Sequence, residues 1–451
     1  MKKTQVALSL AGVMAAATFA PQASALPLFA RQVGMACNAC HFQHFPMLNG
    51  FGRSFKASAY TLMGSESKVE GDNMSLPGVL NAAILTTAGY VKTSQNSNVT
   101  ASGSTTAGTN KKIKNPGSGS VYVPGTNGEF SLFVGGRTSE NSGALAEIGL
   151  LQNGGTGAGI ASTKIPMLWP VGDSGMRAGI VPFTTDGQGA SYGFEILNTG
   201  ANAVHTMVFD GGDANGSIGS IVSAQQYIGT ATPATGAAIV VDNITMGPVT
   251  GFVNVTKYHQ VGPADLGFTG ADLGSTYIRA AGTFDMAGWD TGLGIQSWTG
   301  DSLNSTLTDM QTKATAVDYQ MQGEVAGMPV GIYAEYATAA KPDVGQTNAY
   351  NQSNAGTATE AKQAFVVSTE WGVVPEKVTV GGAIRFGKSG VAMPGKSNAS
   401  DNGFMLEGSY KLAQNMLVNL YYTKQSGDIW TSAYGKTWGD SQITLNLATI
   451  Y

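Results

Sequence analysis

From about Val79 to the last residue, apolar and polar side chains alternate in short runs with a period of two. In residues 317–325 every second position is apolar or glycine, and the positions between them are Asp318, Gln320, Gln322 and Glu324. The same arrangement recurs in residues 365–371, 404–411 and 443–451. Successive side chains of a β-strand point to opposite faces of a sheet, so the pattern predicts many strands with one apolar and one polar face.

Three architectures use such strands: a soluble sandwich, a secreted solenoid or adhesin, and a transmembrane β-barrel. Composition favours the barrel, because the chain has 62 Gly and only 12% charged residues, and a lipid-facing wall around a polar lumen needs few charges. Aromatic residues also gather toward the ends of predicted strands, as they do at membrane interfaces; these are Tyr421, Tyr422, Trp430, Tyr434 and Trp438. We therefore expect a mainly β fold, a transmembrane antiparallel barrel that encloses an aqueous channel.

The length of the chain sets the size of this barrel. About 370 residues are available, and a strand with its share of turn and loop uses about 20–25, so we expect about sixteen strands, with fourteen or eighteen as alternatives. Four polar ranges of low complexity are predicted to be long loops on the cell exterior: 93–128, 210–219, 338–362 and 387–402. Charged residues on polar strand faces are predicted to line the lumen, where they solvate it or guide a cation; they are Glu195, Glu324, Glu335, Glu370, Arg385 and Glu407.

The N-terminal residues follow a different pattern. Lys2 and Lys3 precede an apolar stretch from Val6 to Ala20 and the small residues 23–25, which is the arrangement of a secretory signal peptide. The stretch is short and interrupted for a bilayer-spanning helix. We expect residues 1–25 to be a cleaved signal peptide, 26–76 a small helical segment, and 77–451 a barrel in the outer membrane of a Gram-negative cell. A net charge of −4 is too mild to indicate a nucleic-acid partner.

The two cysteines of the chain lie in Cys37-Asn38-Ala39-Cys40-His41, which has the spacing of c-type haem attachment. Two thiols one helical turn apart reach the two vinyl groups of one porphyrin, and the adjacent imidazole coordinates the iron. A disulfide would close a very small loop and leave His41 unexplained, a redox dithiol would want a βαβ setting, and a zinc site that adds His44 would be crowded. We expect one covalently bound haem c, attached through Cys37 and Cys40, with His41 as the proximal iron ligand.

An apolar stripe with steps of three and four residues follows this motif and predicts a helix against the porphyrin edge, although Pro46 and Gly50 weaken it. Its members are Phe42, Phe45, Leu48, Phe51 and Phe55. Arg53 and Lys56 are either partners of the haem propionates or solvated surface charges. For the distal iron ligand the sequence favours Met63, with Met74 and an open distal site as alternatives.

The residues around the motif resemble one known family. The similar positions are Leu26-Pro27-Leu28-Phe29-Ala30-Arg31-Gln32, Gly34, the C-x-x-C-H motif, Pro46-x-Leu48, Phe51-Gly52-Arg53-x-Phe55-Lys56 and Tyr60-Thr61. They resemble the fused monohaem cytochrome-porins of iron-oxidising bacteria over about residues 26–80, and the rest of the chain is similar only in length and pattern.

This resemblance implies an outer-membrane Fe(II) oxidase. Cys37 and Cys40 would hold the haem, His41 would be its proximal ligand, and the electron would pass to a periplasmic carrier such as a soluble cytochrome c. The resemblance does not indicate the distal ligand.

Two other classes of function stay open. The haem could exchange electrons with another donor or carry them outward, which a measured reduction potential and the addition of Fe(II) would test. The barrel could instead be a solute porin with a structural or gas-sensing haem, which conductance with and without haem and a test for bound CO would reveal.

Overall fold

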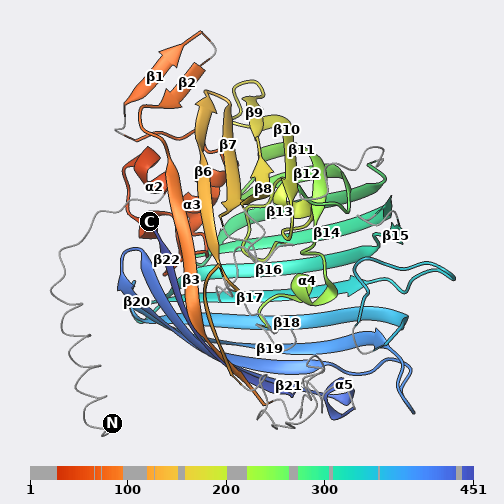
Figure 1. Ribbon diagram of the computed structural model, residues 1–451. Helices are drawn as coiled ribbons and strands as arrows, with labels where there is room; N and C mark the ends of the chain where they lie inside the picture. The colour runs from red at the N-terminus through yellow and green to blue at the C-terminus, as the bar shows by residue number, and fades with distance from the viewer. Residues whose placement is uncertain are drawn as a thin grey trace, which may run out of the picture.

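The computed structural model describes residues 28–64, 67–72, 74–94, 119–125, 127–150, 158–200, 221–263, 273–303, 308–353, 356–432 and 439–451. In these residues the strands close into a barrel, and the helices are short (Figure 1). The wall begins with β3 (Ala82–Thr93) and ends with β22 (Ser441–Ile450), and the barrel closes because these two strands pair antiparallel.

The described wall has sixteen strands when β8 (Gly159–Lys164) and β9 (Met167–Pro170) are counted as one interrupted strand, since both pair with β7 and with β10. The other wall strands are β6 (Phe130–Ser139), β7 (Ser142–Gly149), β10 (Arg177–Thr185), β11 (Ala234–Met246), β12 (Val249–His259), β13 (Ser275–Met286), β14 (Trp289–Leu303), β16 (Ala314–Val325), β17 (Met328–Ala339), β18 (Ala358–Val374), β19 (Val378–Val391), β20 (Asn402–Ala413) and β21 (Met416–Ser426). Three short strands, β4 (Ser120–Pro124), β5 (Asn127–Gly128) and β15 (Asp309–Gln311), extend its edge. The predicted fold class and the predicted size are confirmed.

The two faces of the wall differ as the period of two predicts. Strand β16 lies between β14 and β17. Its residues Asp318 and Gln320 are buried, whereas Val317 of the same strand is 48% exposed. Large apolar side chains on other strands are also exposed on the outside, such as Ile295 of β14 and Leu406 of β20. A soluble sandwich buries its apolar face, so polar residues inside and apolar residues outside indicate a wall surrounded by lipid.

The two ends of the barrel also differ. Short turns join β11 to β12, β13 to β14, β16 to β17 and β20 to β21, and β3 begins and β22 finishes at this same end. We call it the short-turn end; in outer-membrane barrels the short turns face the periplasm. At the other end, the β17–β18 and β19–β20 connections are shorter than predicted, because β17, β18 and β19 continue into the predicted loops. The predicted loop 210–219, and 93–128 except for its ends, lie outside the described residues.

The connection between β10 and β11 folds into the barrel. Its described parts, residues 186–200 and 221–233, contain η3 (Ala190–Tyr192) and α4 (Ala224–Ile228), and all side chains from 190 to 200 are buried. Thr199 donates a hydrogen bond of 2.8 Å to Asp318, and the backbone amide of Ala224 donates one of 2.7 Å to Glu335. This lumen segment therefore occupies part of the channel that the sequence predicts to be aqueous.

The residues before the wall form α2 (Leu28–Val33), η1 (Cys37–Ala39), α3 (Gly50–Ala57) and a hairpin of β1 (Lys68–Gly71) and β2 (Met74–Pro77). Figure 1 shows α2 and α3 beside β3 and the C-terminus, at the short-turn end. The remaining described helix, α5 (Asp428–Thr431), follows β21.

The helix predicted from the apolar stripe is wrong over its first half. Residues 42–46 form bends, and the chain turns back so that the amide of Phe42 donates to the carbonyl of Met47 at 2.9 Å. Pro46 has no amide hydrogen to donate within a helix. Helix α3 starts only after Asn49, whose side chain caps it by accepting from the amide of Gly52 at 2.9 Å.

Residues 43–53 are anchored inside the short-turn end. The amide of Leu48 donates to Asn198 of the lumen segment at 2.8 Å, and the side-chain amide of Asn198 donates back to the carbonyl of Leu48 at 2.9 Å. Arg53 is buried, donates to Gln322 of β16 at 3.1 Å and forms an ion pair with Asp290 of β14. The N-terminal segment is thus held within the lumen by several different strands.

Candidate functional site

The cysteine motif forms a tight turn. The amides of Cys40 and His41 both donate to the carbonyl of Cys37, at 3.1 and 2.9 Å. The side chains of Cys37, Cys40 and His41 therefore all extend from a single turn of the backbone. A Cβ atom on Gly52 would lie 2.1 Å from the carbonyl oxygen of Cys40. Glycine at this position therefore lets α3 pack directly against the motif, and Asn49 strengthens the contact by donating to the carbonyl of Ala39 at 3.0 Å.

The ring of His41 is oriented as in a metal ligand. Its Nδ1 lies 3.1 Å from the carbonyl oxygen of Met47, and a carbonyl can only accept, so Nδ1 carries the hydrogen and Nε2 keeps its lone pair. Burial lowers the pKa of His41 to about 4, which keeps the ring neutral at physiological pH. A neutral imidazole with a free Nε2 is the form that coordinates iron.

Cys37, Cys40 and His41 all line one cavity of about 270 Å³, which we call the motif cavity. Phe29, Phe55 and Tyr60 form an aromatic cluster on its N-terminal side, with the ring of Phe29 centred 5.0 Å from that of Phe55 and 4.7 Å from that of Tyr60. The barrel and the lumen segment supply the other side through Ala83, Phe133, Leu145, Lys164, Tyr192 and Ile450. The cavity is therefore apolar and is shared between the N-terminal segment and the wall.

Two lysines line this otherwise apolar cavity. Lys164 of β8 donates to the carbonyl of Tyr192 at 3.1 Å, and its ammonium group lies 4.3 Å from the centre of the Tyr192 ring. Lys56 of α3 is the second, and burial lowers its pKa to about 8. Cationic side chains beside an apolar cavity suit a ligand that combines an apolar body with carboxylates.

These features fit a c-type haem. The thiols and the imidazole reach one cavity, its lining suits a porphyrin, and the lysines suit propionates. Burial raises the pKa of Cys37, and raises that of Cys40 to about 11, so both thiols are protonated at neutral pH in this structure.

The predicted pocket residues lie in different places in the structure. Leu48, Phe55 and Lys56 line the motif cavity, whereas Phe45 lines a second, smaller one. Phe42 is half-buried and Phe51 is 39% exposed.

Two of the predicted assignments concern residues that do not line the motif cavity. Arg53 contacts Leu48, Gln322 and Asp290, so its charge is used to hold α3 in the barrel. Met63 is half-buried and is not among the lining residues. Its role as distal ligand stays a prediction.

Among the lining residues that were not selected from the sequence, the aromatic residues Phe29, Tyr60 and Tyr192 and the cation Lys164 matter most for the site. Phe29 and Tyr60 belong to the stretches that carry the family resemblance. That resemblance could have identified them as residues of the site. Lys164 and Tyr192 are distant in sequence and reach the cavity only through closure of the barrel and folding of the lumen segment. No local pattern marks them.

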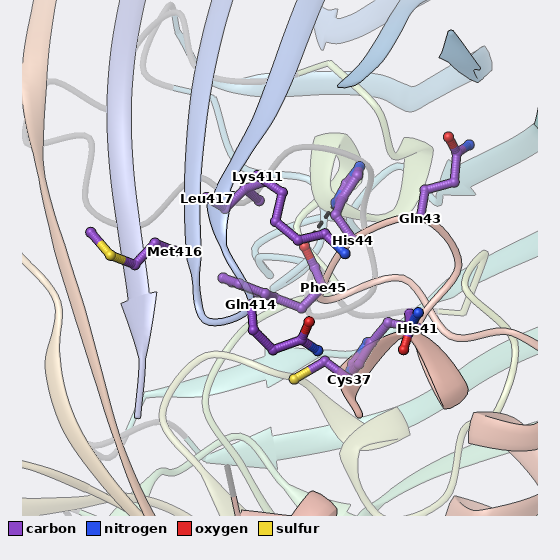
Figure 2. A pocket seen from close by; sticks show the side chains of 10 residues that line it. Cys37, His41, Gln43, His44, Phe45, Lys411, Gln414, Met416 and Leu417 are labelled. Atoms are coloured by element: carbon purple, nitrogen blue, oxygen red, sulfur yellow. Dashed lines mark hydrogen bonds between the residues drawn. The ribbon is translucent and has the colours of Figure 1, made fainter. Parts of the chain in front are cut away.

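The second cavity lies on the other side of the motif. Figure 2 shows Cys37, His41 and His44 facing Lys411, Gln414 and Leu417, which come from the turn region between β20 and β21. The motif is thus in contact with the wall at the short-turn end.

The predicted lumen charges have different environments. Glu335, Glu370, Arg385 and Glu407 are buried on inward faces, and Glu324 is exposed near a short turn. The predicted strand position of Glu195 is wrong, because Glu195 belongs to the lumen segment, where it pairs with Arg279 at 2.9 Å.

Within the described residues, no helix is both long and apolar enough to serve as a membrane span. The closed antiparallel barrel with an apolar exterior defines a porin-like transmembrane β-barrel of the outer-membrane type.

No protein-family profile and no curated protein matches the chain. Among solved structures, the anion-selective porin from Comamonas acidovorans is 11% identical, with a TM-score of 0.47, and the match covers 83% of this chain and 99% of that one. OmpT of Vibrio cholerae is 8% identical, with a TM-score of 0.43 and coverage of 85% and 100%. The outer-membrane channel DcaP of Acinetobacter baumannii is 11% identical, with a TM-score of 0.43 and coverage of 82% and 97%. Likenesses at this level say nothing about what this chain binds.

Proposed function

We propose that the chain is an outer-membrane cytochrome-porin that oxidises extracellular Fe(II) at one covalent haem c and passes the electron to a periplasmic carrier, such as a soluble cytochrome c. One observation carries the proposal: two thiols and an imidazole whose Nδ1 faces the carbonyl of Met47 line the same apolar cavity inside a transmembrane barrel. The lining of this cavity suits the haem chemistry that the family resemblance implies.

The residues of the chain have separable tasks in this proposal. Cys37 and Cys40 hold the haem, and the carbonyl of Met47 orients His41 toward the iron. The contacting rings of Phe29, Phe55 and Tyr60 would exclude water from a haem held in this cavity. When bound, the haem supplies one-electron redox chemistry, whose potential depends on its ligands, burial and nearby charge.

The placement of the site supports electron transfer across the membrane. The barrel wall passes through an apolar layer about 25 Å thick that electrons do not readily cross, and the motif lies inside the lumen at the end assigned to the periplasm. Met35, just before the motif, is exposed, so a periplasmic carrier can approach this part of the chain.

Fe(II) as the donor rests on the family resemblance and on the charge of the lumen. Buried carboxylates on β17, β18 and β20 give the inside of the barrel groups that attract a hard cation. The lumen segment and the N-terminal segment both occupy space in the barrel, which favours this role over free passage of solutes.

Anaerobic addition of Fe(II) to the purified, oxidised full-length protein tests the proposal. We expect a Soret band, its shift to the reduced form, and one Fe(III) formed for each haem reduced. Addition of dithionite is the control, because it shows whether the haem of the same protein can be reduced by a general reductant. A protein without covalent haem, or a haem that dithionite reduces and Fe(II) does not, would contradict the proposed function.

A further inference from the structure

A cluster of metal-binding side chains lies beside the motif and is not used by the haem site. It consists of His44 of the N-terminal segment, Glu370 of β18 and Glu407 of β20, and one ligand atom from each lies within 4.8 Å of the others. Their residues are only 6%, 0% and 7% exposed, respectively. Three parts of the chain that are distant in sequence therefore bring three buried donors to one point.

Two of the donors are held by neighbouring groups. The Nδ1 of His44 lies 2.8 Å from the carbonyl of Phe45, so the hydrogen is on Nδ1 and Nε2 points to the cluster. The hydroxyl of Tyr333 donates to Oε1 of Glu370 at 3.1 Å, which leaves Oε2 of Glu370 at 3.2 Å from Nε2 of His44. Oriented donors of this kind are typical of metal sites, where a second layer of hydrogen bonds fixes each ligand.

Glu407 supplies the observation that points to a missing partner. Both of its carboxylate oxygens are buried, and neither has a hydrogen-bond partner among the described residues. Buried polar groups are normally hydrogen-bonded or coordinate a metal. A protonated His44 would compensate one carboxylate, and the cluster holds two.

We propose that His44, Glu370 and Glu407 bind one divalent transition-metal cation of the Fe²⁺, Mn²⁺ and Zn²⁺ class inside the lumen. Ligand atoms at about 2.1 Å from an ion lie about 3.0–4.2 Å from one another, so a small side-chain rotation closes the observed cluster around an ion. One imidazole nitrogen with carboxylate oxygens suits these ions better than Ca²⁺, which takes oxygen ligands alone, or Cu⁺, which prefers sulfur.

The position of the cluster gives the bound ion a role. His44 and His41 line the same small cavity (Figure 2), so an ion on His44 would sit next to the side of the motif that carries the proximal ligand. Metal binding does not depend on the proposed function. The further assignment, that Fe²⁺ occupies this site before it loses one electron to the ferric haem and becomes Fe³⁺, rests on it.

Mn²⁺ binding to the full-length, haem-containing protein in detergent tests the site, because Mn²⁺ is not oxidised by the haem and free Mn²⁺ is measured by electron paramagnetic resonance. We expect one Mn²⁺ per chain, and at least about tenfold weaker binding in Glu407→Gln. Glu147→Gln is the matched control, since Glu147 is a half-buried acid of the distant strand β7 that accepts from Ser162, and its binding should equal that of the wild type. No binding by the wild type, or equal binding in Glu407→Gln, would overturn the site.

The kinetics of haem reduction then separate this proposal from the proposed function. We expect Glu407→Gln to slow reduction by Fe²⁺ and to leave reduction by dithionite unchanged. If the wild type binds Mn²⁺ but Fe²⁺ does not reduce it, the proposed function fails and the metal site stands. If Fe²⁺ reduces a wild type that binds no Mn²⁺, the metal site fails and the proposed function stands. Equal Fe²⁺ rates in Glu407→Gln and the wild type would overturn the assignment of the site to the substrate.

Discussion

Replacing Arg53 by Met should make α3 open more often from its position in the lumen without unfolding the barrel. Arg53 is buried and donates to the carbonyl of Leu48 at 3.2 Å and to Gln322 at 3.1 Å, in addition to its ion pair with Asp290. Methionine keeps much of the apolar stem and removes the charge and the donors. The strands have their own hydrogen-bond ladders and do not depend on this contact.

The size of the effect follows from these contacts. A hydrogen bond from a charged group contributes about 1.5–3 kcal/mol, and we take the lower value for each of the two bonds to neutral acceptors. The Asp290 side chain is 38% exposed, so its ion pair adds little. The total is about 3 kcal/mol, which corresponds to about a hundredfold change in the equilibrium for local opening of α3.

Native-state hydrogen exchange measured by mass spectrometry is the suitable assay. Peptides from α3 should exchange about a hundredfold faster in Arg53→Met, and peptides from β13 should be unchanged. Arg177→Met is the control, because Arg177 also pairs with a carboxylate, Asp242 at 3.0 Å, within the wall. If α3 exchanges at the same rate in Arg53→Met and in the wild type, the reasoning is refuted. If the haem reduction potential also differs between the two proteins, Arg53 interacts with the haem and does not hold α3.

The remaining predictions concern the haem site. Cys37→Ala or Cys40→Ala should abolish the full covalent attachment of haem, seen as loss of haem staining on denaturing gels, while heat-modifiability of the barrel is kept; staining that stays in both variants would exclude these thiols. Met63→Ala should alter the reduced-state spectrum or the potential, because Met63 is the predicted distal ligand, and an unchanged spectrum and potential would remove it as a ligand. Lys164→Met should lower the haem reduction potential in a redox titration, because removing a nearby positive charge stabilises the ferric form; a potential equal to that of the wild type would place Lys164 away from the propionates.

The barrel was predictable because its signal is local and repeated. Each strand carries its own alternation, and the length of the chain limits the number of strands. The cysteine motif was predictable for the same reason, since the thiols and His41 are adjacent in sequence. The helix over residues 42–48 was not, because Pro46 and the turn back to Met47 override the apolar spacing.

Local sequence thus determined that this chain forms a two-faced β wall and presents two thiols beside an imidazole. Only the tertiary structure decided what surrounds them, because ring closure and strand register bring Lys164 to the motif cavity and place Glu370 and Glu407 next to His44. These residues come from strands that are far apart in sequence, and each one taken alone is an ordinary inward-facing polar residue. Their chemistry arises from being near one another, and that nearness is a property of the closed barrel.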